Sequence, residues 1–117
     1  MSDSQAYPQL RNDVLRRMGE LGRAVPGTMQ GFQALHDAAV REGALSPKMK
    51  ELIALGIAIA VHCEGCIACH VHDALQHGAS REEIAETVGV AVMMGGGPSV
   101  VYGSMAMAAV EQFQGPK

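Results

Sequence analysis

Apolar residues recur at intervals of three and four along most of the chain, and they do not alternate with polar residues. This spacing gathers apolar side chains on one face of an α-helix, whereas alternation would gather them on one face of a strand. The pattern therefore predicts an all-α protein. The first helix is expected to open at Pro8 and to end within residues 22–27, with an apolar face made of Leu10, Val14, Leu15, Met18 and Leu21.

The next two helices are delimited by a glycine stop and by a capping sequence. The second is expected over residues 26–41, ended by Gly43 in the left-handed conformation. Ser46-Pro47 marks the start of the third, because serine caps free N–H groups and proline fits the first helical position. This helix runs to about Val61 and is apolar on nearly every side, so we expect it at the centre. The residues expected to face inward from the second helix are Phe32, Leu35, Ala39 and Val40.

Three further helices complete the prediction of a six-helix bundle built around an antiparallel helical hairpin. The fourth helix is expected from Cys63 or Glu64 to His77, before Gly78. Ser80 and Glu83 form a capping box that starts the fifth. Residues 95–98, Gly-Gly-Gly-Pro, are interpreted as a helix break and not as a phosphate loop, since no Lys-Ser/Thr follows them. The sixth helix is expected over residues 98–113. Inward positions of the last two helices are Ile84, Val88, Val90, Ala91, Met94, Val100, Val101, Met105 and Ala108.

The length and charge of the chain exclude several classes of protein. The 117 residues are most simply one domain, with N-terminal helices in residues 1–44 and a core in residues 45–107. A chain this short gains much stability from forming homo-oligomers. A net charge of −3 without any run of Lys or Arg gives no electrostatic basis for binding nucleic acid or anionic membranes. The uncharged run 52–61 is about half of a membrane span, and no leader segment is evident, so we expect a soluble, cytoplasmic protein.

The candidate chemistry lies in residues 51–77, which hold all three cysteines and four of the five histidines. Cys63 and Cys66 are three residues apart, and on a helix this spacing places their Cα atoms roughly 5 Å apart, within reach of a disulfide. The helix N-terminus and the imidazole of His70 both favour a thiolate. His70 lies one turn from Cys66, whereas the helix end favours Cys63. We expect Cys66 to attack and Cys63 to resolve.

Glu51 is the residue that we expect to orient the imidazole of His70. If the third and fourth helices form an antiparallel hairpin that turns near residue 62, then His70 lies opposite Leu55, one turn from Glu51. A carboxylate that accepts from one ring nitrogen orients the imidazole and leaves the other nitrogen to take a proton from sulfur. The alternative is that Glu51 is a surface residue in the first turn of its helix, beside Lys48 and Lys50.

The spacing of Glu51, Cys63, Cys66 and His70 resembles the signature of the carboxymuconolactone decarboxylase-like superfamily, in its alkylhydroperoxidase D branch. The resemblance covers residues 45–107, including Lys50-Glu51-Leu52 and residues 78–84 and 94–98. It implies an all-helical fold, homo-oligomers that are commonly trimers or hexamers, and peroxidase activity. In that reaction Cys66 attacks a peroxide, Cys63 resolves, Glu51 and His70 relay protons, and a lipoyl-type or thioredoxin-type dithiol is the reductant. No cofactor or metal is expected.

Two positions depart from the family pattern. The best-known peroxidases of this branch carry a second histidine between the two cysteines, where this chain has Gly65. Cys69 stands where relatives often have an aromatic residue. We interpret it as a buried structural thiol, and the alternative is that it traps a sulfenate or competes for the disulfide. The founding decarboxylases lack the cysteine pair, which argues against decarboxylase activity.

Two other functions remain open. Cys63, Cys66, Cys69 and His70 offer four ligands for Zn²⁺, although one continuous helix wraps a tetrahedral ion poorly. A non-catalytic oligomeric scaffold or stress-response partner is the other, because Gly65 removes one relay member. The remaining histidines are interpreted as packing or surface residues, with His62 in the turn between helices; they are His36, His62, His72 and His77.

Overall fold

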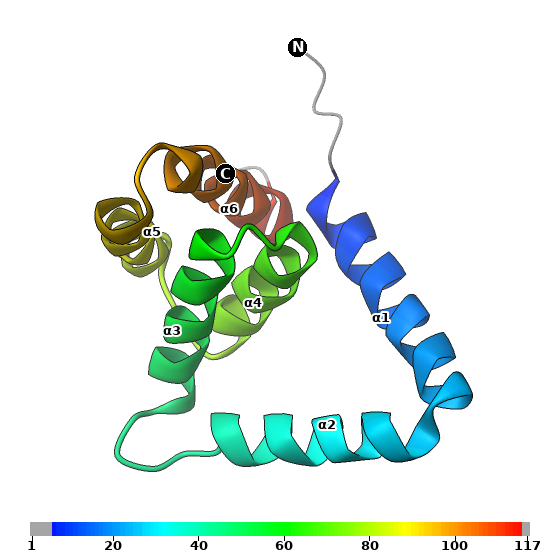
Figure 1. Ribbon diagram of the computed structural model, residues 1–117. Coiled ribbons are helices and arrows are strands. Elements are labelled where there is room, and N and C mark those ends of the chain that lie inside the picture. Colours follow the sequence, from blue (N-terminus) through cyan, green and yellow to red (C-terminus); the bar gives the residue numbers. More distant parts are fainter. Residues whose placement is uncertain (1–5, 116–117) are drawn as a thin grey trace.

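The computed structural model describes residues 6–115, and within this range the chain forms six α-helices and no strand (Figure 1). The predicted all-helical class and helix number are therefore confirmed. Each boundary lies within one or two residues of its expected position. The left-handed stop expected at Gly43 is wrong, because α2 ends at Val40, Arg41 is already extended, and Gly43 does not adopt a positive φ. The helices are α1 (Tyr7–Ala24), α2 (Pro26–Val40), α3 (Pro47–Ala60), α4 (Glu64–Gln76), α5 (Arg81–Gly95) and α6 (Gly97–Gln114).

The predicted capping residues do start α3 and α5. The Ser46 hydroxyl accepts a hydrogen bond from the Met49 amide at 3.1 Å. Ser80 and Glu83 exchange two bonds, with the Ser80 amide donating to Glu83 Oε1 at 2.9 Å and the Glu83 amide donating to Ser80 Oγ at 3.0 Å. Lys48 Nζ also donates to Glu83 Oε2 at 2.9 Å, which ties α3 to α5. The Ser80 amide and then the Lys48 ammonium hold the pKa of Glu83 below its usual value.

The core lies where the α3–α4 hairpin packs against α5 and α6 (Figure 1). Branched side chains fill it, and alanines between them let the helices approach closely. Since aromatic residues are scarce, this aliphatic packing agrees with the composition. The fully buried large side chains are Leu55, Ile59, Ile67, Val71, Ile84 and Val110. No helix within residues 6–115 has the length and apolar character needed to cross a membrane.

The contact between α5 and α6 depends on a glycine. A Cβ atom at Gly103 would lie 2.5 Å from Val88 Cγ1, well inside van der Waals contact. Gly103 therefore lets the two helices approach more closely than alanine would.

The α2 helix corrects the predicted pattern of burial. Its apolar side chains were expected to face inward, yet α2 has no buried residue, and Phe32 and Leu35 are 48% and 64% exposed. Figure 1 shows the reason, since α2 runs between the far ends of α1 and α3, away from the other helices. The same expectation is wrong for other apolar residues that are exposed in the described part of the chain, namely Leu15, Met18, Leu21, Val90, Met94, Val100 and Val101.

We predict that Gly103→Ala lowers the free energy of unfolding by about 1–3 kcal/mol, the usual cost of overpacking. Gly89→Ala is the matched control, because Gly89 lies inside α5 with open space around its Cα hydrogen. There the better helix propensity of alanine should raise stability by about 0.5–1 kcal/mol. Urea unfolding followed by circular dichroism measures both. Equal effects of the two substitutions would contradict the close contact at Gly103.

Candidate redox site

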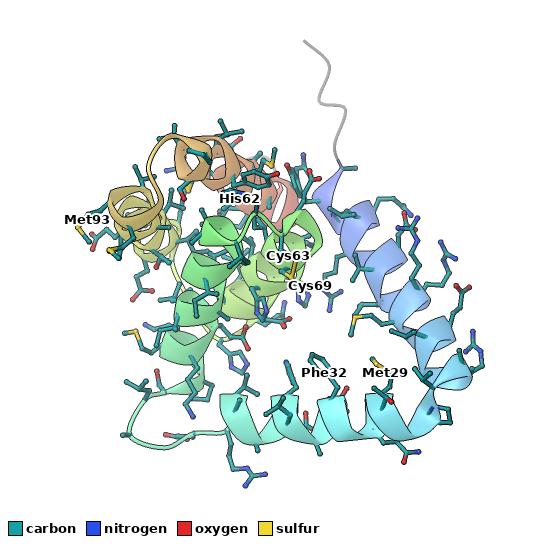
Figure 2. All side chains as sticks on the ribbon, viewed as in Figure 1. Met29, Phe32, His62, Cys63, Cys69 and Met93 are labelled. Carbon is teal, nitrogen blue, oxygen red and sulfur yellow. A yellow bond between two sulfur atoms is a disulfide. The ribbon has the colours of Figure 1, made fainter. Side chains whose placement is uncertain are left out.

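The turn between α3 and α4 places the cysteine pair. His62 adopts φ 63°, a left-handed conformation that non-glycine residues rarely take. Its ring stacks on Tyr102 of α6, with ring centres 4.7 Å apart and an interplanar angle of 12°. The Cys63 amide donates to the carbonyl oxygen of Ala58 at 3.0 Å, which closes the turn. His62 is thus the turn residue that we expected. Its contact with α6 holds the turn in place directly before Cys63 (Figure 2).

Cys63 and Cys66 form a disulfide, with their Cα atoms 5.2 Å apart as the spacing predicted. One assumption behind that prediction was wrong, because Cys63 is not inside the helix. It is the N-cap of α4 with an extended backbone, and its Sγ accepts a hydrogen bond from the Cys66 amide at 3.3 Å. Cys63 is half-buried and Cys66 is exposed. The sulfur at the positive end of the helix dipole is therefore Cys63, and the sulfur open to a substrate is Cys66.

Glu51 and His70 meet across the α3–α4 hairpin. Glu51 Oε1 lies 2.7 Å from His70 Nδ1, and Glu51 is only 3% exposed. The alternative of a surface glutamate is therefore wrong. When the carboxylate accepts this bond, Nδ1 carries the ring proton and Nε2 is left as the basic nitrogen. Within residues 6–115 no hydrogen bond joins the His70 ring to either sulfur of the disulfide.

Helix α1 covers the N-terminal end of α4. A Cβ atom at Gly65 would lie 3.1 Å from Val14 Cγ2, so Val14 occupies space beside the backbone between the two cysteines. Tyr7 is buried, its amide donates to Gln112 Oε1 at 2.6 Å, and its hydroxyl bonds to Glu64. Burial and then the Glu64 carboxylate raise the pKa of Tyr7. These contacts were not foreseen, because nothing in the sequence pairs α1 with α4.

Cys69 is a free, half-buried thiol. Burial and then the Asp73 carboxylate raise its pKa, and the Arg11 guanidinium of α1 partly opposes them. A raised pKa reduces the thiolate fraction at neutral pH, which fits the interpretation of Cys69 as a structural thiol.

The other histidines contact nearby side chains. His72 lies edge-on to Phe113, with ring centres 5.4 Å apart, and its Nδ1 is 2.9 Å from Asp73 Oδ1. His77 caps the C-terminus of α4 through its backbone, and the ring of His36 lies beside its neighbour Asp37.

The four-ligand zinc set is not assembled in this form of the protein, because the sulfurs of Cys63 and Cys66 are bonded to each other. The described residues contain one group with metal-like spacing, made of Glu51, His70 and Asp73, whose ligand atoms lie within 4.8 Å of one another. In that group Glu51 already bonds His70, so the geometry is that of a hydrogen-bonded pair with a carboxylate nearby.

Fold and site together define an all-helical protein with a Cys-x-x-Cys pair at a helix N-terminus and a buried carboxylate–imidazole pair beside it. A sequence profile of the Carboxymuconolactone decarboxylase family matches residues 26–111. The chain therefore belongs to the carboxymuconolactone decarboxylase family.

Solved structures and curated relatives agree with this assignment. The crystal structure of an apo carboxymuconolactone decarboxylase family protein from Legionella pneumophila is 40% identical, with a TM-score of 0.90 over 93% of this chain and 97% of that one. A Thermotoga maritima protein is 31% identical, with a TM-score of 0.73 over 81% and 89%. An uncharacterised protein of Cupriavidus necator is 41% identical over 82% of this chain and 85% of its own. Uncharacterised protein 4 in the cox locus of Paracoccus denitrificans is 34% identical over 84% and 88%.

We predict that His62→Val is less stable than His62→Gly by about 1 kcal/mol, because a β-branched residue resists the left-handed conformation and glycine accepts it. Both variants lose the stacking on Tyr102, so their difference isolates the backbone. Thermal unfolding of the two variants measures it. Equal stabilities would mean that the turn relaxes to a negative φ.

A second prediction concerns the acidity of Cys69. In the disulfide form, the rate of alkylation of Cys69 by iodoacetamide should rise with pH around a midpoint above that of free cysteine. Asp73→Asn should lower this midpoint, because it removes a carboxylate that disfavours the thiolate, and Arg11→Gln should raise it. The midpoint is the readout, since burial also slows the absolute rate. A shift of the same sign in both variants would contradict this assignment of causes.

Proposed function

We propose that this chain is a thiol-dependent hydroperoxide reductase of the alkylhydroperoxidase D type, in which Cys63 and Cys66 form the redox pair. The observation that carries the proposal is the buried Glu51 carboxylate bonded to His70, one helical turn from the exposed Cys66. A buried carboxylate of this kind orients an imidazole and stabilises its protonated form. Both effects help the imidazole to act as a catalytic base.

The reaction starts from the dithiol form. His70 takes the Cys66 thiol proton at Nε2, and the thiolate attacks the outer oxygen of the peroxide. The O–O bond breaks, the sulfur becomes a sulfenic acid, and the alkoxide leaves as an alcohol with a proton returned by His70. The Cys63 thiol gives up its proton to solvent, and its thiolate displaces hydroxide from the sulfenic sulfur. The disulfide forms, and the hydroxide takes a proton back from solvent to become water. An external dithiol, of lipoyl or thioredoxin type, reduces the bond by exchange.

The roles of the two cysteines follow from their environments. Cys66 is exposed, as an attacking sulfur must be, and His70 is four residues further along the same helix. Cys63 is half-buried and accepts the N–H of Cys66, a contact that stabilises a resolving thiolate without a second base.

Position 65 is the observation that favours a second candidate, a non-catalytic member of the family. The best-known peroxidases carry a histidine there, whereas this chain has Gly65, and a Cβ at this position would press against Val14 Cγ2 at 3.1 Å. If Glu51 and His70 do not suffice as a relay, the fold remains and the peroxidase activity is lost.

We predict that Cys66→Ser abolishes peroxide-dependent dithiol oxidation, since it removes the attacking sulfur. Glu51→Gln should lower the rate by about 10- to 100-fold, part of the about 10²–10⁴-fold that general acid–base catalysis contributes. Cys69→Ser is the matched control and should retain activity. Peroxide consumption with lipoyl and thioredoxin reductants measures all three variants, and unchanged turnover in Cys66→Ser excludes the mechanism.

Trapping the intermediate assigns the two sulfurs. In Cys63→Ser the reaction should stop at a Cys66 sulfenic acid, which dimedone labels and mass spectrometry locates. Labelling of Cys63 in Cys66→Ser, with none of Cys66 in Cys63→Ser, would reverse the roles.

A further inference from the structure

Arg11 is a charged side chain of α1 that has no carboxylate in contact with it. It is half-buried, and it forms no ion pair within residues 6–115. Arg16 of the same helix, by contrast, pairs with both Asp13 and Glu20. Taking a cation partly out of water costs free energy unless negative charge compensates it. Arg11 is therefore available to a negative group that forms during function.

Two contacts of α1 with α4 bracket Cys66. A Cβ atom at Gly65, directly before Cys66, would lie 3.1 Å from Val14 Cγ2. Burial raises the pKa of the Cys69 thiol, one turn after Cys66, and the Arg11 guanidinium acts in the opposite direction. Arg11 and Val14 are three residues apart, so they share one face of α1. Cys66 thus lies between the two points of α4 on which this face of α1 acts.

The sulfur of Cys66 lies on the side of α4 from which Arg11 acts. Figure 2 shows Cys63 and Cys69 on the side of α4 that faces α1. Cys66 is three residues from each of them, and its sulfur is bonded to that of Cys63. Since residues three apart share one face of a helix, Cys66 shares this side.

The other titratable groups near the cysteine pair are three carboxylates, two imidazoles and two phenols, from α1, α3, α4, α6 and the turn before Cys63. They are Glu51, Glu64 and Asp73, His62 and His70, and Tyr7 and Tyr102. The carboxylates disfavour a thiolate, and the imidazoles are positive only when protonated. Among these described groups, Arg11 alone adds a positive charge that is present at every pH at which thiols titrate.

We propose that Arg11 stabilises the thiolate of Cys66 in the dithiol form, and that it therefore acts together with His70 on the attacking sulfur. A cation beside a thiol favours the thiolate, which is the nucleophile. The charge comes from α1, the helix whose Val14 takes the space beside Gly65. The part of Arg11 in the attack rests on the proposed function, whereas its effect on the acidity of the thiol does not.

A chain with a single cysteine measures the acidity of Cys66 without any peroxide. In Cys63→Ser/Cys69→Ser the only thiol is Cys66, and serine at position 63 can still cap α4. The rate of alkylation by iodoacetamide, followed against pH, gives the midpoint of thiol ionisation. Arg11→Gln in this parent should raise the midpoint by about 0.5–1 pH unit, because it removes a nearby opposite charge. Arg11→Lys should reverse most of the shift, because it keeps the charge.

Arg17→Gln is the matched control. Arg17 lies on the same helix, is exposed and also forms no ion pair in the described part of the chain, so its removal changes the net charge equally. It should leave the midpoint unchanged, and circular dichroism should show equal helix content in all chains. Equal midpoints for Arg11→Gln and its parent would overturn the proposal. An equal shift in Arg17→Gln, or no recovery in Arg11→Lys, would also overturn it.

The peroxidase assay separates this proposal from the proposed function. In the otherwise wild-type chain, Arg11→Gln should lower the rate of peroxide-dependent dithiol oxidation at neutral pH by about 3- to 10-fold, the loss of thiolate that the expected shift produces. The two rates should converge well above the midpoint, where both thiols are ionised. A shifted midpoint in chains that all lack peroxidase activity would support the stabilised thiolate and contradict the proposed function. A slower reaction with an unshifted midpoint would overturn the role of Arg11.

Discussion

The hydrogen bond between Glu51 and His70 is the constraint on which the site depends. Burying a carboxylate without a partner costs several kcal/mol, so Glu51 at 3% exposure requires the imidazole opposite it. This requirement fixes the register of α3 against α4, because a slip of one residue would separate the two side chains. The same register sets where the hairpin turns, and therefore where Cys63 caps α4. The register of α3 against α4 therefore determines both the packing of the hairpin and the geometry of the site.

The N-terminal helices belong to this arrangement as well. Helix α1 contacts the start of α4 through Tyr7, which bonds to Glu64, and through Val14, which lies beside Gly65, and the charge of Arg11 acts on Cys69. Since α2 follows α1 after one residue, whatever holds α2 also holds α1 over the cysteine pair.

The helix ends of this protein could be predicted from its sequence. Contacts between helices could be predicted only where a catalytic arrangement requires a particular side chain. Ser46, Ser80 and Gly78 predicted helix ends because caps depend on neighbouring residues alone. Gly43 did not, because α2 ends at Val40 without a left-handed glycine. The Glu51–His70 contact was predictable because an orienting carboxylate was needed on the facing helix. The burial of α2 was mispredicted, since an apolar face indicates that a helix packs but not that its partner lies in the same chain. The stacking of His62 on Tyr102 and the contact of Val14 with Gly65 left no signal in the spacing.

The missing histidine at position 65 is best understood through the different surroundings of the two sulfurs. In the proposed reaction a single imidazole can serve the attack, because the proton it takes from Cys66 is the proton that the leaving alkoxide needs. The proposed resolution step needs a second thiolate, and for that step the chain would use its backbone. Cys63 sits at the N-cap, where the Cys66 amide donates to its sulfur and the helix dipole favours negative charge. In the proposed reaction the base activates one cysteine and the helix end the other, so Val14 can occupy the space beside Gly65 without removing a required group.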